Sequence, residues 1–520
     1  MARALGIVVV AAGTIGFVGA IVIPGIALAV GAGTGACADG AAIWPSARQW
    51  GLYGRTVGMA VCGTALAMVL ALPGAWAIAR VRRFSHAPLV GALAFVPLLM
   101  PPMIVVFGWQ RLLGGYWFRD LSPMARCVWV WASWGWPIPA MILAAGWMRV
   151  GRSVCEAAVL VTTPGNAFLR AVAPSLRRHV MVSAVILLVW FVGEYSVPHA
   201  NGVFVMASEL MDTAGQSAAG EMAVRVLGLS WPLIVVTVAG IVVASKCWPA
   251  PDGASGGMVY SEATSRRGKA LVLMIVIVGV TCGLPLTGVA GRRALIGDLA
   301  ETVTTYWPEL LGSVGLCTAS GVLAVIMGMA LTAGVRPARI GLVGTFLFGV
   351  VPGAVVGSAM LSAYRPAEWM NAFPRAAEAS WWFYGHWPIV LIGLAGRFAW
   401  VGWLAGWMAT RGVPRAHQEQ SSLDGAAGLT QTVTMCWRHQ WPVLVCGVAV
   451  ASAMAMSEFA VVGVVGVPSP TMLAMLVIEK FHRFEYGMLA ALSVCLMVSA
   501  VPGTVLVWAV LRRREWAGYG

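Results

Sequence analysis

Apolar residues fill most of the chain in runs of about 20, and the short segments between these runs hold most of the charge. A helix of that length spans the roughly 30 Å hydrocarbon core of a bilayer. The runs lie at about 5–30, 57–79, 88–110, 128–148, 180–199, 223–245, 270–290, 312–334, 341–363, 387–409, 442–464 and 488–510. The pattern therefore predicts an all-α polytopic membrane protein with about twelve transmembrane helices.

Composition agrees with this pattern and excludes an ordinary soluble domain. The 520 residues are 59% apolar and only 10% charged, and the mean hydropathy is +0.83. The first apolar run, from Gly6 to Val30, is longer than the apolar core of a signal peptide. We therefore expect it to be a retained transmembrane helix.

The distribution of basic residues predicts how the chain is oriented. With the N-terminus inside, the inner segments hold 21 Lys/Arg against 6 Asp/Glu, and the outer segments hold 11 against 12. Basic residues accumulate on the cytoplasmic side of membrane proteins. We expect a multi-pass protein of the bacterial inner membrane with both termini in the cytoplasm. The net charge of +14 then needs no nucleic-acid partner.

A polar linker divides the chain into two halves. Residues 246–269 are rich in Gly, Ser, Pro and basic residues, and six apolar runs stand on each side. The halves, 1–245 and 270–520, therefore enter the membrane the same way round. Any internal repeat must be parallel.

Three pairs of segments occur in the same order in both halves. "GTALAMVLALPGAWAIARVRR" resembles "ASGVLAVIMGMALTAGVRPAR". "FVPLLMPPMIVVFG" resembles "FLFGVVPGAVVG", and we expect Pro to break each of these two spans near its start. "VWFVGEYSVP" resembles "AMAMSEFAVVGV", which places Glu194 and Glu458 264 residues apart. Three anchors in one order favour a duplication.

The cytoplasmic loops 149–178 and 410–441 each contain a stretch that begins with Glu. In the first loop, "EAAVLV" predicts a short helix, "TTPGN" with Pro164 and Gly165 ends it, and "AFLRAVAP" leads into the next span. The second loop contains "EQSSLDGAAGLTQTVTMCWRHQWP". We expect each loop to present a short helix across the cytoplasmic mouth, accessible to a partner.

At these loops the chain resembles the permease subunits of binding-protein-dependent ABC importers of the type I fold. Their signature is Glu-Ala-Ala, three residues, Gly, and then a Pro entering the next helix, and their loop docks on a separate ATPase. The matching positions of the first loop are Glu156, Ala157, Ala158 and Pro174, with Thr162 in place of Gly. Those of the second loop are Glu419, Asp424, Gly425 and Pro442, with Leu423 beside them and without the two alanines.

The fused length and the segments "GRFAW" and "GEYSVP" are similar to the branch that imports ferric iron. Related branches carry thiamine, polyamines, sulfate or phosphonates, so the cargo stays open. The resemblance implies an extracytoplasmic solute-binding protein that selects the substrate. It also implies ABC ATPase subunits, expected as a homodimer.

The chain contains no phosphate-binding loop of the form G-x-x-x-x-G-K-[ST]. We therefore expect ATP to be hydrolysed on another polypeptide, and this chain to be neither an enzyme nor the holder of a cofactor. The cysteines and histidines are dispersed, which argues against a metal site.

Three ionisable residues lie within or at the edge of the predicted spans: Glu194, Glu458 and Arg397. Charges at membrane depth face the bundle interior or water, which predicts a translocation path or gate. The alternative for the carboxylates is a hydrogen bond to a broken helix end, with Pro198 as the expected break. For Arg397 the alternatives are an acidic partner and simple snorkelling.

Two other classes of protein remain as alternatives. An ion-coupled secondary transporter also has twelve helices, but this class does not explain two Glu-led cytoplasmic loops. A membrane-embedded lipid-modifying enzyme would need longer hydrophilic loops than the chain contains. The sequence thus favours a permease subunit.

Overall fold

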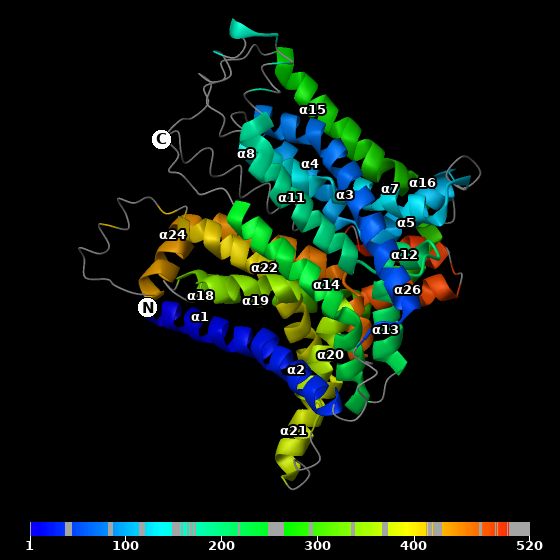
Figure 1. The fold of residues 1–520 in the computed structure, drawn as a ribbon, viewed down its shortest axis with the longest axis vertical. Coiled ribbons are helices and arrows are strands. Elements are labelled where there is room, and N and C mark those ends of the chain that lie inside the picture. The colour runs from blue at the N-terminus through cyan, green and yellow to red at the C-terminus, as the bar shows by residue number, and fades with distance from the viewer. Residues whose placement is uncertain are drawn as a thin grey trace.

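A computed structural model shows the fold (Figure 1). It describes residues 2–36, 44–81, 87–113, 120–147, 157, 160–163, 166, 170, 173–216, 219–247, 265–290, 295–333, 338–366, 373–411, 413, 419, 429–466, 471–483, 485, 487–496 and 498. Among these residues the regular structure is entirely helical.

Residues 1–245, the N-terminal half, contain ten described α-helices and helical turns before α13 and α14, the last of which ends just beyond the half. They are α1 (Ala2–Phe17), the π-helical turn η1 (Val18–Val22), α2 (Ile23–Ala36), α3 (Ala47–Val81), α4 (Ala87–Leu99), α5 (Pro102–Leu113), α7 (Pro123–Gly135), α8 (Pro137–Trp147), α11 (Ala173–Gly193), α12 (Ser196–Ala200), α13 (Met206–Gln216) and α14 (Ala219–Cys247).

The C-terminal half, residues 270–520, continues a helix that starts just before it. Its elements are α15 (Ser265–Val278), the π-helical turn η4 (Gly279–Gly283), α16 (Leu284–Ala290), α17 (Leu295–Thr305), α18 (Trp307–Ala333), α19 (Ala338–Val350), α20 (Gly353–Tyr364), α21 (Pro374–Gly385), α22 (Trp387–Arg411), α24 (Leu429–Met456), α25 (Ala460–Val465) and α26 (Leu473–His482).

Eight of the described helices are long and apolar enough to cross a membrane, and up to eleven if each of three bent pairs forms one span. This confirms a polytopic, all-helical membrane protein. The predicted twelfth span, about 488–510, is described only in part, with an apolar helix from Gly487 to Leu496. Exposed side chains such as Ile15 and Val272 belong to these helices, as expected for surfaces that face lipid.

The bent pairs place the expected proline breaks in mid-span. The α4–α5 pair bends by 83° and the α19–α20 pair by 112°, at Pro101 and Pro352. Proline has no backbone N–H and disfavours a helical conformation in the residue before it, so each helix ends there. The predicted position near the start of each span was wrong, because both breaks lie in the middle of the predicted runs 88–110 and 341–363. In the first span Pro97 is accommodated inside α4, whereas in the second the break falls at Pro352, the proline of the predicted segment.

The first span of each half packs against the other half. Helix α1 contacts α18 and α24, and α2 contacts α20 as well as α14. In the other direction, α15 contacts α3 and α4, while α16 contacts α5. Figure 1 shows α15 running beside α3 and α1 beside α18. The two halves therefore share one helical assembly.

Candidate functional site

The span that begins with α11 breaks at a carboxylate. Helix α11 ends at Gly193, and α12 starts two residues after Glu194. The Glu194 carboxylate accepts hydrogen bonds from the backbone N–H groups of Ser196 (2.6 Å) and Val197 (3.0 Å), and from the Ser196 hydroxyl. The predicted break at Pro198 was wrong, because Pro198 lies inside α12.

The C-terminal half repeats this arrangement. Helix α24 ends at Met456 and α25 starts at Ala460. Between them, Glu458 Oε1 accepts hydrogen bonds from the N–H groups of Ala460 (3.1 Å) and Val461 (3.3 Å). In both halves the donors are the second and third residues after the Glu.

The two carboxylates therefore cap broken helix ends. The first N–H groups of a helix have no partner within the helix, and they carry the positive end of its dipole. An acidic side chain that accepts from them stabilises the start of the new helix. The alternative in which each Glu bonds to a helix end is confirmed for both residues.

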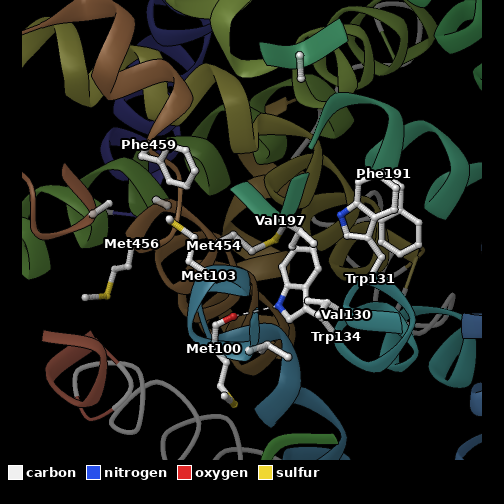
Figure 2. Close-up of a cluster of buried hydrophobic side chains, with 14 of the residues drawn as sticks. Met100, Met103, Val130, Trp131, Trp134, Phe191, Val197, Met454, Met456 and Phe459 are labelled. Carbon is white, nitrogen blue, oxygen red and sulfur yellow. Dashed lines mark hydrogen bonds between the residues drawn. The ribbon is translucent and has the colours of Figure 1, made fainter. Parts of the chain in front are cut away.

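Two tryptophans support the break in the N-terminal half. The indole N–H of Trp131 donates to Glu194 Oε2 over 2.9 Å, and its ring stacks on Phe191 at an interplanar angle of 4°. The indole N–H of Trp134 donates over 2.9 Å to the carbonyl of Met100, just after the end of α4. Figure 2 shows this bond within a buried cluster to which both halves contribute.

In the C-terminal half a single arginine contacts both the capping carboxylate and the end of helix α19. Arg397 Nε lies 3.3 Å from Glu458 Oε2. Its Nη1 donates to the carbonyls of Val351 and Phe348 at the end of α19. Because the side chain of Arg397 is only 7% exposed and that of Glu458 13%, the pair is held away from bulk water. The acidic partner expected for Arg397 is confirmed, and it is Glu458.

A cavity of about 270 Å³ lies beside both breaks and between the halves. Glu194, Glu458 and Arg397 all line it. Its walls are largely apolar, and Trp190 of α11 meets Trp400 of α22 there with ring centroids 6.5 Å apart. The structure thus brings the three predicted path residues to one cavity.

Sequence reasoning missed the tryptophans of this site, because Trp in an apolar run is also typical of membrane interfaces. One signal was available. The spacing of 264 between Glu194 and Glu458 maps Arg397 onto residue 133, between Trp131 and Trp134. A search for hydrogen-bond donors on either side of residue 133 would have found both tryptophans.

The predicted coupling loops are described at a few positions only. In the first, Ala157, Leu160 and Val161 are exposed, Thr162 is half-buried, and Pro174 lies in the first turn of α11. Glu156, Ala158, Pro164 and Gly165 lie outside the described residues.

In the second loop Glu419 is exposed, while Leu423, Asp424 and Gly425 lie outside the described residues. Pro442 lies near the middle of α24 rather than at a helix entry. Leu160 and Val161 are each 87% exposed, which makes them the most accessible large apolar side chains among the described residues.

Over the described part of the chain, no group of three or more His, Cys, Asp or Glu residues is placed to hold a metal ion. No protein-family model matches the chain, and no curated protein or solved structure matches it either.

Proposed function

We propose that the chain is the transmembrane permease subunit of an ATP-driven ABC importer of the type I fold. In this proposal the two halves form the translocation path and the linker 246–269 lies in the cytoplasm. Separate ATPase subunits hydrolyse ATP, and an extracytoplasmic binding protein delivers the solute. The loops 149–178 and 410–441 transmit ATPase movements to the helices.

The observation that carries this proposal is the pair of Glu-capped helix breaks at one cavity between the halves. Irregular backbone at membrane depth is tolerated where it is buried in protein or lines a water-filled cavity. Glu194 and Glu458 stand at such breaks, one from each half, and both line the cavity. A path between two halves that move relative to each other fits this placement.

Matched elements support two parallel six-helix halves. The first span of each half contains one π-helical turn, Val18–Val22 and Gly279–Gly283. The third span of each half is a bent pair with Pro at the break. The first span of each half packs against helices of the other half. A duplicated and fused permease would have these features.

The described part of the first loop supports an ATPase contact. Leu160 and Val161 follow the Glu-Ala-Ala sequence and are almost fully exposed, although they belong to no candidate span. A short helix with exposed apolar side chains binds well in a groove on a partner. Both loops lie on the side of the membrane where Lys and Arg accumulate in the sequence.

Ferric iron or another small solute delivered by a binding protein remains the proposed cargo. In the cavity, the carboxylates already accept hydrogen bonds from helix ends, and Glu458 also pairs with Arg397. The site therefore offers few unengaged ligands for selecting a bare ion. This supports a division of labour in which the binding protein sets specificity.

The test is co-purification with an ABC ATPase that contains a phosphate-binding loop. We expect the ATPase to remain bound to the native chain and to be lost when Glu156→Lys and Glu419→Lys are combined, because both loops then present reversed charge. The matched control is Glu301→Lys with Glu378→Lys, two substitutions outside the loops, which should retain the ATPase. Retention by the loop variant would contradict the proposal.

Reconstitution in liposomes distinguishes the proposed importer from an ion-coupled secondary transporter. The buried Arg397–Glu458 pair is the observation that favours the secondary transporter. Uptake by liposomes that contain this chain alone, driven by a proton gradient, would indicate that class. Uptake that requires the ATPase, ATP and a binding protein supports the importer.

A further inference from the structure

A pair of histidines joins the two halves next to the cavity. His199 lies in α12 of the N-terminal half, and His482 is the last residue of α26 of the C-terminal half. Their Nε2 atoms are 3.1 Å apart, and their ring centroids are 5.2 Å apart. This distance is that of a hydrogen bond between two imidazoles.

The hydrogen bond connects to the cavity through Tyr195. The Tyr195 hydroxyl lies 2.9 Å from His199 Nδ1, and Tyr195 itself lines the cavity beside Glu194. A neutral imidazole has one donor and one acceptor nitrogen, whereas a protonated imidazole has two donors. The Nε2–Nε2 bond therefore exists only while at least one of the two rings is neutral.

Aromatic rings from both halves surround the pair. Phe481 of α26 packs edge-on against His199 and also contacts Phe107 of α5, with centroids 5.9 and 5.2 Å apart. Tyr195 meets Phe459, which follows the other helix break, at 5.5 Å. Loss of the histidine bond would thus loosen the contact between the two halves at the breaks.

Neighbouring elements carry further charged groups. In the N-terminal half these charged groups are Arg111 of α5, Arg126 of α7, Glu194 at the helix break, and Glu209 and Asp212 of α13. In the C-terminal half they are Glu309 of α18, Glu479 and Lys480 of α26, and Arg483 and Glu485 just after α26. Lys480 pairs with Glu485 and Arg483 with Glu479.

We propose that the His199–His482 pair is a proton-sensitive latch that holds the two halves together beside the cavity at neutral pH and releases them in acid. This goes beyond the proposed function, because it assigns to the contact between α12 and α26 a response to protons that needs neither ATPase nor binding protein. Two imidazole nitrogens fill only half of a tetrahedral metal site, and the described residues supply no third ligand. The proton is therefore the ligand that the pair fits.

The direction of the response follows from linkage. A second proton would leave the paired rings without an acceptor nitrogen, so the closed contact binds that proton less readily than separated rings do. The closed contact is therefore favoured at high pH and lost as the pH falls through the histidine range. When both rings are protonated, the acceptor is gone and two like charges face each other.

Hydrogen exchange of the full chain in lipid nanodiscs, read by mass spectrometry, tests the latch. Peptides covering 195–205 and 473–483 are followed at pH 7.5, 6.5 and 5.5, with times corrected for intrinsic exchange. We expect faster corrected exchange in both peptides at pH 5.5 than at pH 7.5, because protonation of both rings removes the acceptor nitrogen of the bond. Peptides from α18 should not change. An acid response that is absent from the two latch peptides, or equal in α18, would overturn the proposal.

Variants separate the histidines from other titrating groups. His199→Gln with His482→Gln keeps hydrogen-bonding side chains that do not titrate, and it should abolish the acid response, as should His482→Gln alone. His386→Gln, at an exposed histidine of the α21–α22 junction, should retain it. Burial and Glu209 raise the pKa of Asp212, so Asp212→Asn is tested too and should retain the response. A response that survives both latch variants, or is lost in Asp212→Asn, would overturn the assignment.

Discussion

Arg397 performs with one side chain the two tasks that Trp131 and Trp134 share in the N-terminal half. In each half, one donor reaches the capping carboxylate and another reaches a carbonyl at the end of the preceding bent helix. The chemical difference is charge, because indole donors are neutral and the guanidinium is a cation. The Glu458 carboxylate thus has a cationic partner within salt-bridge distance, whereas Trp131, Ser196 and Val197 donate to Glu194 as neutral groups.

Arg397→Met should destabilise the protein more than any other single change at the site. It leaves the buried Glu458 charge without its cation and two carbonyls without a donor, which costs about 3–5 kcal/mol for a buried pair. Thermal unfolding in detergent measures the loss. The double variant Arg397→Met with Glu458→Gln should regain part of it, and an unchanged midpoint for Arg397→Met would contradict the ion-pair assignment.

Trp131→Phe should have a smaller effect. Phenylalanine preserves the stacking on Phe191 but removes the N–H donor to Glu194, and a hydrogen bond to a charged group contributes about 1.5–3 kcal/mol. The same unfolding assay applies, with Trp441→Phe at an exposed ring of α24 as the control. Equal midpoints for the two variants would show that the indole donor does not stabilise the break.

At the scale of elements, the positions of the spans could be predicted from the sequence, but the breaks could be predicted only in part. The bends at Pro101 and Pro352 follow from local chemistry. The break at Glu194 has no such local cause, and α11 ends five residues before Pro198. Proline alone was a poor guide, because Pro232 and Pro442 lie inside helices. In membrane proteins, neighbouring helices compensate for the lost backbone bond.

The contact between α18 and α22 depends on two glycines. A Cβ added at Gly402 would overlap the carbonyl of Ala324, and one added at Gly328 would overlap the backbone of Gly402. Small residues allow such close approach of membrane helices.

Gly402→Ala should therefore push the helices apart and destabilise the protein by about 1–3 kcal/mol, as overpacking does. The control is Gly54→Ala in α3, where a Cβ would meet nothing within 4 Å. Alanine should stabilise that helix by about 0.5–1 kcal/mol. Unfolding midpoints of the two variants should move in opposite directions, and a neutral Gly402→Ala would contradict the close approach.

At the scale of the whole molecule, the sequence indicated two halves with similar patterns but not where their first spans pack. Helices that face lipid are apolar on all sides, so their pattern does not specify a partner. The positions of small residues hold part of the missing information. Gly13 of α1 lies against Ala330 and the backbone of Ile326 in α18, and Gly16 lies against Leu323 and Met327.

The exchanged first spans predict that the halves stay together without a covalent connection. A protease site inserted between Gly253 and Ala254, in the linker, should be cleaved in detergent while the two fragments continue to elute as one species. The reason is that α1 packs on α18 and α24, and α15 and α16 pack on α3, α4 and α5. Gly13→Leu, whose side chain would overlap Ile326 and Ala330, should promote separation after cleavage. Gly268→Leu, at a position with open space, should not. Fragments of the otherwise unchanged protein that separate on size-exclusion chromatography would show that the linker, rather than the exchanged helices, holds the halves together.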